Sequence, residues 1–260
     1  MGRFLIRAAQ SLRNSLLGGF LVDILLMRHA EASSSHMGSE VISSEPSLTP
    51  LGRKQALRAA AFLQHVGIER IYCSPMLRSL ETAALVGNVL SFRPYVWPLL
   101  AERGLGGANP GLRRSEILEM FPQVYLPPEV DEDGWARHWD GETPEQLDAR
   151  MSKVKAELFE RARTDDLSCI LCVGHGGSMS ALLRHFFGVR PDSRLRFVHD
   201  NCGITPLRFE DDWRHGSPKC TVVNERRHLI GLDRDEIPAG VSPTCFTDWW
   251  SIPTKPWPPE

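Results

Sequence analysis

The segment CILCVG at 169–174 places the strongest constraint on the fold, because apolar residues follow one another there without alternating with polar ones. A strand of this kind is buried on both faces, as in the middle of a parallel sheet that helices cover on each side. The segment VDILLM at 22–27 has nearly the same character. We therefore expect an α/β protein in which CILCVG is the central strand.

Signals for helices alternate with the predicted strands. Thr49-Pro50 and Thr143-Pro144 each place an N-capping threonine before a proline at the first helical position. Ser74-Pro75 repeats this arrangement, and Ser178 is expected to open a further helix. The remaining predicted strands are IYC at 71–73, YVWPLL at 95–100, CGITPLRF at 202–209 and CTVVN at 220–224. This alternation predicts a three-layer α/β/α sandwich with a mostly parallel central sheet.

The chain of 260 residues is long enough for one large core and short for two. We expect one domain over 22–234. Within it, the glycine- and proline-rich residues 101–142 are interpreted as an insertion over the site, because a long irregular loop in a compact domain is usually functional. A proline- and tryptophan-rich tail follows at 235–260.

Residues 1–21 form a predicted N-terminal amphipathic extension with Arg3, Arg7 and Arg13 and with no acidic residue. This pattern is similar to a mitochondrial presequence or an interfacial helix, and a surface helix without a targeting role is the alternative. We expect a cytoplasmic protein, with a mitochondrial location as the alternative. No run of about 18 apolar residues indicates a transmembrane helix. The net charge of −2 gives no general attraction to nucleic acid or to anionic membranes.

The chain has six cysteines, mostly in apolar or strand-like contexts. Cys169-x-x-Cys172 has the spacing of a redox pair or half a zinc site, but it lies inside the apolar run and no second such pair exists. Core packing is the favoured interpretation.

Polar residues follow four of the predicted strands. In open α/β sheets, ligands bind at the carboxyl ends of the strands. We therefore expect five side chains to converge there: Arg28, His29, Arg78, Glu102 and His175. Guanidinium groups match a phosphoryl group, a neutral imidazole can attack phosphorus, and a carboxylic acid can protonate a leaving oxygen. Backbone N–H groups at the start of the helix near Ser178 are expected to add an anion site.

The segments MRHAE, LTPLGRKQA, CSPMLRSLETA and VGHGG occur in this order between 27 and 177. Together they resemble the histidine phosphatase superfamily, the phosphoglycerate mutase-like group. The resemblance implies that His29 is the phosphorylated nucleophile, that Arg28 and Arg78 clamp the phosphate, and that His175 is the second pocket histidine. It also implies that Glu102 is the proton donor and that neither a metal nor a cofactor is needed.

Several positions favour a phosphatase of the histidine acid type over a mutase. Ser35 stands where mutases carry Asn, and Ser33-Ser34 replace their tryptophan and acidic residue. Arg113-Arg114 is the nearest match to the paired arginines of mutases, in a different sequence context. Ser35 and Gly176 are the expected substrate-binding residues. Mutase-type phosphoryl transfer and a catalytically silent phospho-ligand binding module remain the alternatives.

A metal phosphohydrolase could use His175, His199 and Asp200, but that reading leaves both arginines unexplained. The expected partner is a small phosphorylated metabolite or a phosphoprotein, with no nucleic acid and no integral membrane span. A homodimer is left open. The identity of the substrate does not follow from these residues.

Overall fold

A five-stranded mixed sheet forms the centre of the computed structural model, which describes residues 21–33, 45–103, 110–136, 141–190, 192–210 and 218–232. The strand order is β3-β2-β4-β1-β5. The middle strand β4 (Cys169–Gly174) pairs in parallel with β1 (Val22–Arg28) and with β2 (Arg70–Cys73). At the two edges, β3 (Tyr95–Val96) is parallel and β5 (Ile204–Phe209) is antiparallel. The prediction that CILCVG is central is confirmed.

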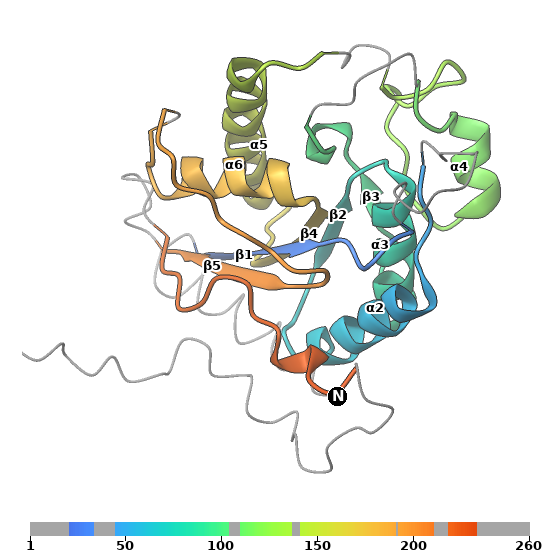
Figure 1. Cartoon of the computed structure of the whole chain (residues 1–260), viewed down its shortest axis with the longest axis horizontal. Coiled ribbons are helices and arrows are strands. Elements are labelled where there is room, and N and C mark those ends of the chain that lie inside the picture. Colours follow the sequence, from blue (N-terminus) through green and yellow to red (C-terminus); the bar gives the residue numbers. More distant parts are fainter. Residues whose placement is uncertain are drawn as a thin grey trace, which may run out of the picture.

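Helices cover both faces of this sheet, as Figure 1 shows. Helices α2 (Pro50–Leu63) and α3 (Leu77–Leu90) lie on one face, and α5 (Pro144–Thr164) and α6 (Gly176–Phe186) lie on the other. Successive strand residues point to opposite faces. Leu25 and Leu171 therefore belong to the core under α2 and α3, whereas Ile24 packs with α5 and α6. The predicted three-layer α/β sandwich is confirmed.

Two of the helices start as the sequence predicts. Oγ1 of Thr49 accepts a hydrogen bond of 3.0 Å from the amide of Gly52, and Thr143 forms a reciprocal capping box with Gln146. The other two starts were predicted wrongly. Helix α3 begins at Leu77, and the hydroxyl of Ser74 bonds to a buried histidine and to the amide of Met76. Helix α6 begins at Gly176, two residues before Ser178.

Two predicted strands are shorter than expected or absent. Of YVWPLL only Tyr95–Val96 pairs in the sheet, and Pro98–Leu100 forms the 3-10 helix η1. Proline has no N–H to donate to a strand ladder, which accounts for this early end. CTVVN at 220–224 is not a strand: isolated bridges flank it at Lys219 and Glu225. The following 3-10 helix η3 spans Arg227–Leu229.

The described part of 101–142 contains the helix α4 (Arg114–Met120) and packs into the domain. Ile117 is fully buried there, and Val130 and Trp135 join the same core. This segment, expected to be irregular, thus contains a short helix, and its assignment as an insertion over the site stays a prediction. Residues 1–20 of the predicted extension, the predicted tail and Ser35 lie outside the described residues. In the described ranges, no helix is both long enough and apolar enough to cross a membrane.

The CxxC cysteines lie in the strand β4, and both thiols are free and fully buried. Burial raises the pKa of the Cys172 thiol to about 12. A thiol of this kind is inert as a nucleophile and a poor metal ligand. These observations favour the interpretation as core residues.

Candidate active site

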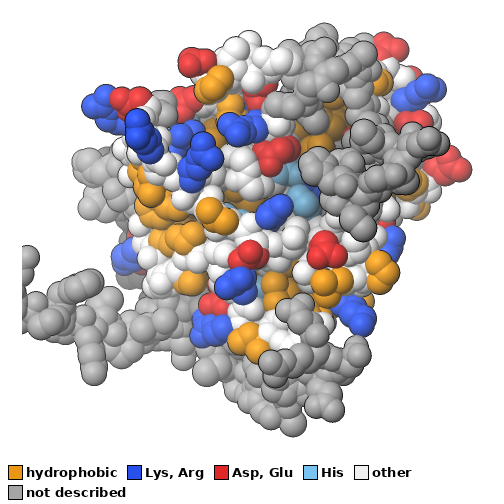
Figure 2. Space-filling model, viewed as in Figure 1, with side chains coloured by type: hydrophobic (Ala, Val, Ile, Leu, Met, Phe, Trp, Pro, Cys, Tyr) orange, Lys and Arg blue, Asp and Glu red, His pale blue; other side chains and the backbone are white. Residues whose placement is uncertain are grey.

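The five side chains expected to converge come together at the carboxyl end of β1 and β4. Nε of Arg78 lies 3.2 Å from Nε2 of His29, and the rings of His29 and His175 have centroids 5.1 Å apart. The positive charge of Arg28 acts on both imidazoles. The carboxylate of Glu102 is near enough to influence the pKa of Arg78. On the face in Figure 2, histidine side chains reach the surface near the middle, between basic and acidic side chains.

The hydrogen bonds of His29 determine which of its nitrogens is free to react. Nδ1 lies 2.7 Å from the carbonyl oxygen of Ala30, which can only accept, so Nδ1 must carry the hydrogen. Nε2 faces the guanidinium of Arg78, which can only donate, so Nε2 must hold a lone pair. The arrangement thus presents a neutral imidazole with Nε2 as its basic atom.

The surroundings of His29 keep it neutral. Burial, with the charge of Arg78, lowers the pKa of His29 to about 3. The hydrogen bond to Ala30 acts in the opposite direction but is the smaller effect. Burial, with the charges of the nearby arginines, also lowers the pKa of His175. Burial is the largest effect on Arg78 too and lowers its pKa, although arginine stays charged at physiological pH. Two neutral imidazoles therefore lie beside two cations.

Two buried polar atoms in this cluster have no hydrogen-bond partner among the described residues: Nε of Arg28 and Nδ1 of His175. A buried donor without a partner is costly, and such groups occur at sites that receive a ligand. One other nitrogen of each side chain has a partner within the protein. Nη1 of Arg28 donates to the carbonyl of His199 at 2.8 Å, and Nε2 of His175 lies 2.7 Å from Oγ of Ser74. The two unpaired atoms suit the oxygens of an anion.

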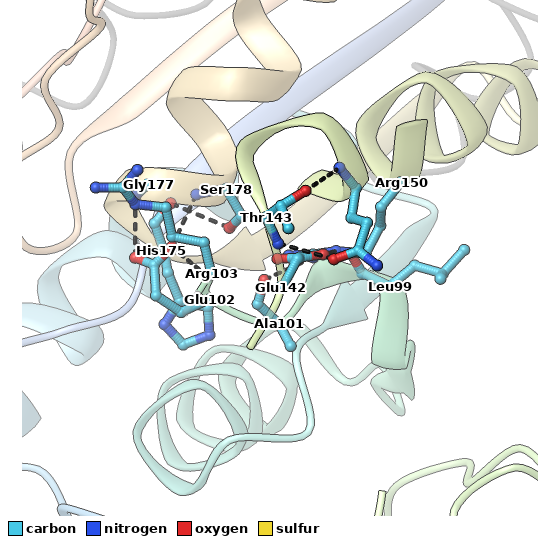
Figure 3. A network of polar contacts seen from close by, with 11 residues as sticks. Leu99, Ala101, Glu102, Arg103, Glu142, Thr143, Arg150, His175, Gly177 and Ser178 are labelled. Carbon is cyan, nitrogen blue, oxygen red and sulfur yellow. Dashed lines mark hydrogen bonds and ion pairs between the residues drawn. The ribbon is translucent and has the colours of Figure 1, made fainter. Parts of the chain in front are cut away.

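Glu102 lies at the start of α6 (Figure 3). Its carboxylate accepts hydrogen bonds of 2.9 Å from the amides of Gly177 and Ser178 and from its neighbour Arg103. The expectation that these helix amides bind a ligand anion was therefore wrong for two of them, because a carboxylate of the protein occupies that place. Gly176, expected to bind substrate, is the first residue of α6 and lies close to Nε of Arg28.

A turn before β5 holds the backbone of Arg28 and His29 and was missed from the sequence. Nδ2 of Asn201 donates to the carbonyl of His29 at 3.0 Å, and the amide of Cys202 donates to that of Arg28 at 3.1 Å. The rule about carboxyl ends of strands applies to parallel strands. Since β5 is antiparallel, Ile204 pairs with Met27 and the residues before β5 reach the same edge. The antiparallel direction was not readable from the pattern.

The alternative metal site receives no support from the positions of its residues. His175 bonds to Ser74, His199 to Thr205, and Asp200 to Asn224 and Arg226. Among the residues that the structure describes, no group of three or more His, Cys, Asp or Glu side chains could hold a metal ion.

The buried histidines make stability depend on pH. Burial lowers the pKa of His199 and His228 to about 4, in the same direction as His29 and His175. An imidazole in the unfolded chain titrates near pH 6.5. Between about pH 4 and 6.5 the unfolded state therefore binds more protons than the folded state, and acid favours unfolding.

We expect the free energy of unfolding to fall between pH 7 and pH 5, by up to roughly 1.4 kcal/mol per pH unit for each such histidine below pH 6.5. Urea denaturation at fixed pH values measures this slope. The variant His228→Gln keeps a donor for the carbonyl of Cys202, which His228 contacts at 3.0 Å, and should show a shallower slope. Equal slopes in the variant and the wild type would contradict the assignment.

The comparisons with known proteins cover the part of the chain that contains these site residues. The family model of the histidine phosphatase superfamily (branch 1) matches residues 24–224. The chain belongs to the histidine phosphatase superfamily. Named relatives include the probable phosphoglycerate mutase GpmB of Yersinia enterocolitica, 25% identical over 84% of this chain and 99% of that protein. The acid phosphatase of Mycobacterium tuberculosis is 28% identical over 79% of this chain and 93% of its own length.

Solved structures of this superfamily share the fold. A mutant phosphoserine phosphatase from Entamoeba histolytica, in complex with phosphoserine, aligns with a TM-score of 0.56 at 21% identity. The alignment covers 80% of this chain and all of that one. The predicted membership of the superfamily is confirmed, and its named members include both phosphatases and mutases.

Proposed function

We propose that the protein is a phosphatase that hydrolyses phosphomonoesters through a phosphohistidine at His29, without a metal ion. The observation that supports this most is the state of His29: a neutral imidazole whose Nε2 lone pair lies 3.2 Å from an arginine. A neutral imidazole is a competent nucleophile, and the arginine can orient the phosphoryl group for attack.

In the first step, Nε2 of His29 attacks phosphorus and the bond from phosphorus to the ester oxygen breaks. The leaving oxygen takes a proton from the carboxylic acid of Glu102, which becomes a carboxylate. Arg28, Arg78 and Nδ1 of His175 hold the phosphoryl oxygens as charge develops on them. The unpaired Nε of Arg28 and Nδ1 of His175 support these roles.

In the second step, water attacks the phosphohistidine and the P–N bond breaks, which returns the electron pair to Nε2 of His29. Glu102 now accepts a proton from the water and is ready for another cycle. The hydrogen bond from Nδ1 of His29 to the carbonyl of Ala30, at 2.7 Å, keeps the ring in one orientation through both steps.

Hydrolysis is favoured over mutase activity by the positions of the paired arginines. Nη1 of Arg114 donates to the backbone carbonyls of Pro127 and Val130, so this side chain has a structural role within the insertion. A mutase must hold a second anionic group while the phosphoryl group moves. Arg113-Arg114 is the nearest sequence match to a second anion-binding pair. One of these two arginines, Arg114, is thus already bonded to the backbone of the insertion.

We propose a small phosphorylated metabolite as the substrate. Named relatives include a putative phosphoserine phosphatase of Hydrogenobacter thermophilus, 27% identical over 73% of this chain. A panel of phosphorylated amino acids, sugars, glycerates and nucleotides, tested with wild type and His29→Ala, would identify the preferred class. Phosphate release in the wild type alone supports the proposal. Binding without turnover on every compound would favour a silent phospho-ligand binding module.

The variant Glu102→Gln tests the proton donor. An activated aryl phosphate leaves without help from an acid, whereas an alkyl phosphate needs a proton on its leaving oxygen. We expect kcat for the alkyl ester to fall by roughly 10²-fold or more, and kcat for the aryl ester to fall much less. Losses of equal size for the two esters would exclude a donor role for Glu102.

A further inference from the structure

The backbone just before Glu102 is held by a residue far away in the sequence. This segment is not part of the sheet, and its carbonyl groups need partners outside a strand ladder. Nη1 of Arg150, on α5, donates to the carbonyls of Leu99 and Ala101, at 2.8 Å each. Ala101 is fully buried, so these two bonds fix the chain directly behind Glu102.

The other side of the Arg150 guanidinium faces Glu142. Nε and Nη2 donate to the two carboxylate oxygens at 2.7 and 2.6 Å, a bidentate pair. The two side chains are only 7% and 10% exposed. A planar guanidinium offers its donors in fixed directions, so this pair sets the direction in which Nη1 points. Figure 3 shows Arg150 and Glu142 on one side of Ala101, with Glu102 and the start of α6 on the other.

The carboxylate of Glu102 is held from the opposite direction by the amides of Gly177 and Ser178. A Cβ atom on Gly177 would lie 2.6 Å from Oε1 of Glu102, so glycine at 177 gives the carboxylate its room. Helices α5 and α6 contribute Met151 and Met179 to the same buried core. Arg150 on α5 and the amides at the start of α6, which hold Glu102 and the backbone before it, therefore belong to helices that share one core.

We propose that Arg150, oriented by Glu142, is the positioning residue for Glu102. Arg150 on α5 holds the backbone before Glu102, and the amides of α6 bind its carboxylate. Removing the guanidinium of Arg150 is expected to shift Glu102 away from the leaving oxygen. This proposal rests on the proposed function, in which Glu102 protonates that oxygen. A displacement of about 1 Å can cost on the order of 10²-fold in rate, so the effect is expected in catalysis.

The test compares an alkyl phosphate with an activated aryl phosphate in the variant Arg150→Lys. Lysine keeps the charge but cannot reach both carbonyls and the carboxylate with fixed geometry. We expect kcat for the alkyl ester to fall roughly tenfold, and kcat for the aryl ester to change by less than about twofold. In a Glu102→Gln background, Arg150→Lys should have no further effect on the alkyl ester, because the acid it positions is gone.

Arg208→Lys is the matched control. Arg208 forms a bidentate pair with Asp23, at 2.7 Å for both bonds, near the amino end of β1 and away from the site. We expect no difference between the two esters in this variant. If Arg150→Lys does not fold, Glu142→Gln replaces it, since it keeps Arg150 bonded to the carbonyls and should show a smaller loss of the same kind.

Equal losses for both esters, or losses that add to those of Glu102→Gln, would overturn the positioning role. The Glu102→Gln result separates this failure from a failure of the proposed function. If Glu102→Gln alone discriminates between the esters while the Arg150 and Glu142 variants do not, only the inference about Arg150 is wrong. If Glu102→Gln does not discriminate, the proton-donor role is wrong.

Discussion

Replacing His29 with alanine is expected to lower kcat for any phosphomonoester by a factor of at least about 10³, because it removes the attacking atom. The lone pair of Nε2 has no substitute within the cluster, because Nε2 of His175 bonds to Ser74, Nδ1 of His175 is assigned to a phosphoryl oxygen, and arginines cannot act as nucleophiles. Phosphate release from an activated aryl ester measures this effect, because the aryl leaving group does not need a proton from Glu102.

The control for this variant is His65→Ala, because His65 is an exposed histidine after α2. Its activity should equal that of the wild type. Thermal unfolding of both variants shows whether the His29 variant is still folded. A folded His29→Ala protein that retains a tenth or more of the activity would contradict the nucleophile role.

Replacing Arg78 with lysine is expected to lower kcat/KM by roughly 10²-fold, although the charge is kept. Nε of Arg78 contacts Nε2 of His29, and its Nη2 lies 3.4 Å from the sulfur of Met76, so the guanidinium has one orientation beside His29. An ammonium group is a point charge and cannot align the phosphoryl oxygens in the same way.

Arg53→Lys is the matched control for this substitution. Arg53 also forms an ion pair, with Glu81 at 2.8 Å, but its side chain is 53% exposed and it lies on α2. An exposed pair of this kind contributes little. Steady-state kinetics should show no change for Arg53→Lys. If Arg78→Lys were as active as this control, Arg78 would not be a phosphate clamp.

Much of the fold could be predicted because its signals are local. The apolar run of β4 specifies burial on both faces, and Thr49 and Thr143 act through bonds within their own helix turns. Ser74 has the same local pattern, yet its hydroxyl bonds to His175, which is 101 residues away. Competition from a distant buried group is not visible in a local pattern.

The residues of the candidate site that lie at the ends of parallel strands were predictable from the sequence. Arg28 ends β1, and His29 and His175 directly follow the parallel strands β1 and β4, so one rule about strand ends places them together. Asn201 was missed because it precedes an antiparallel strand. Arg150 was also missed, although a signal existed: it stands three residues after Leu147, on the apolar face of a predicted helix. A charged residue in that position indicates a buried partner.

The stereochemical course at phosphorus distinguishes a phosphohistidine intermediate from direct attack by water. Each in-line displacement inverts the configuration of phosphorus, so a phosphohistidine route has two inversions and gives net retention. The measurement uses an aryl phosphorothioate made chiral with two oxygen isotopes, hydrolyses it in water that carries the third isotope, and determines the configuration of the released thiophosphate. We expect retention. Inversion would show direct attack by water and would contradict a phosphohistidine at His29.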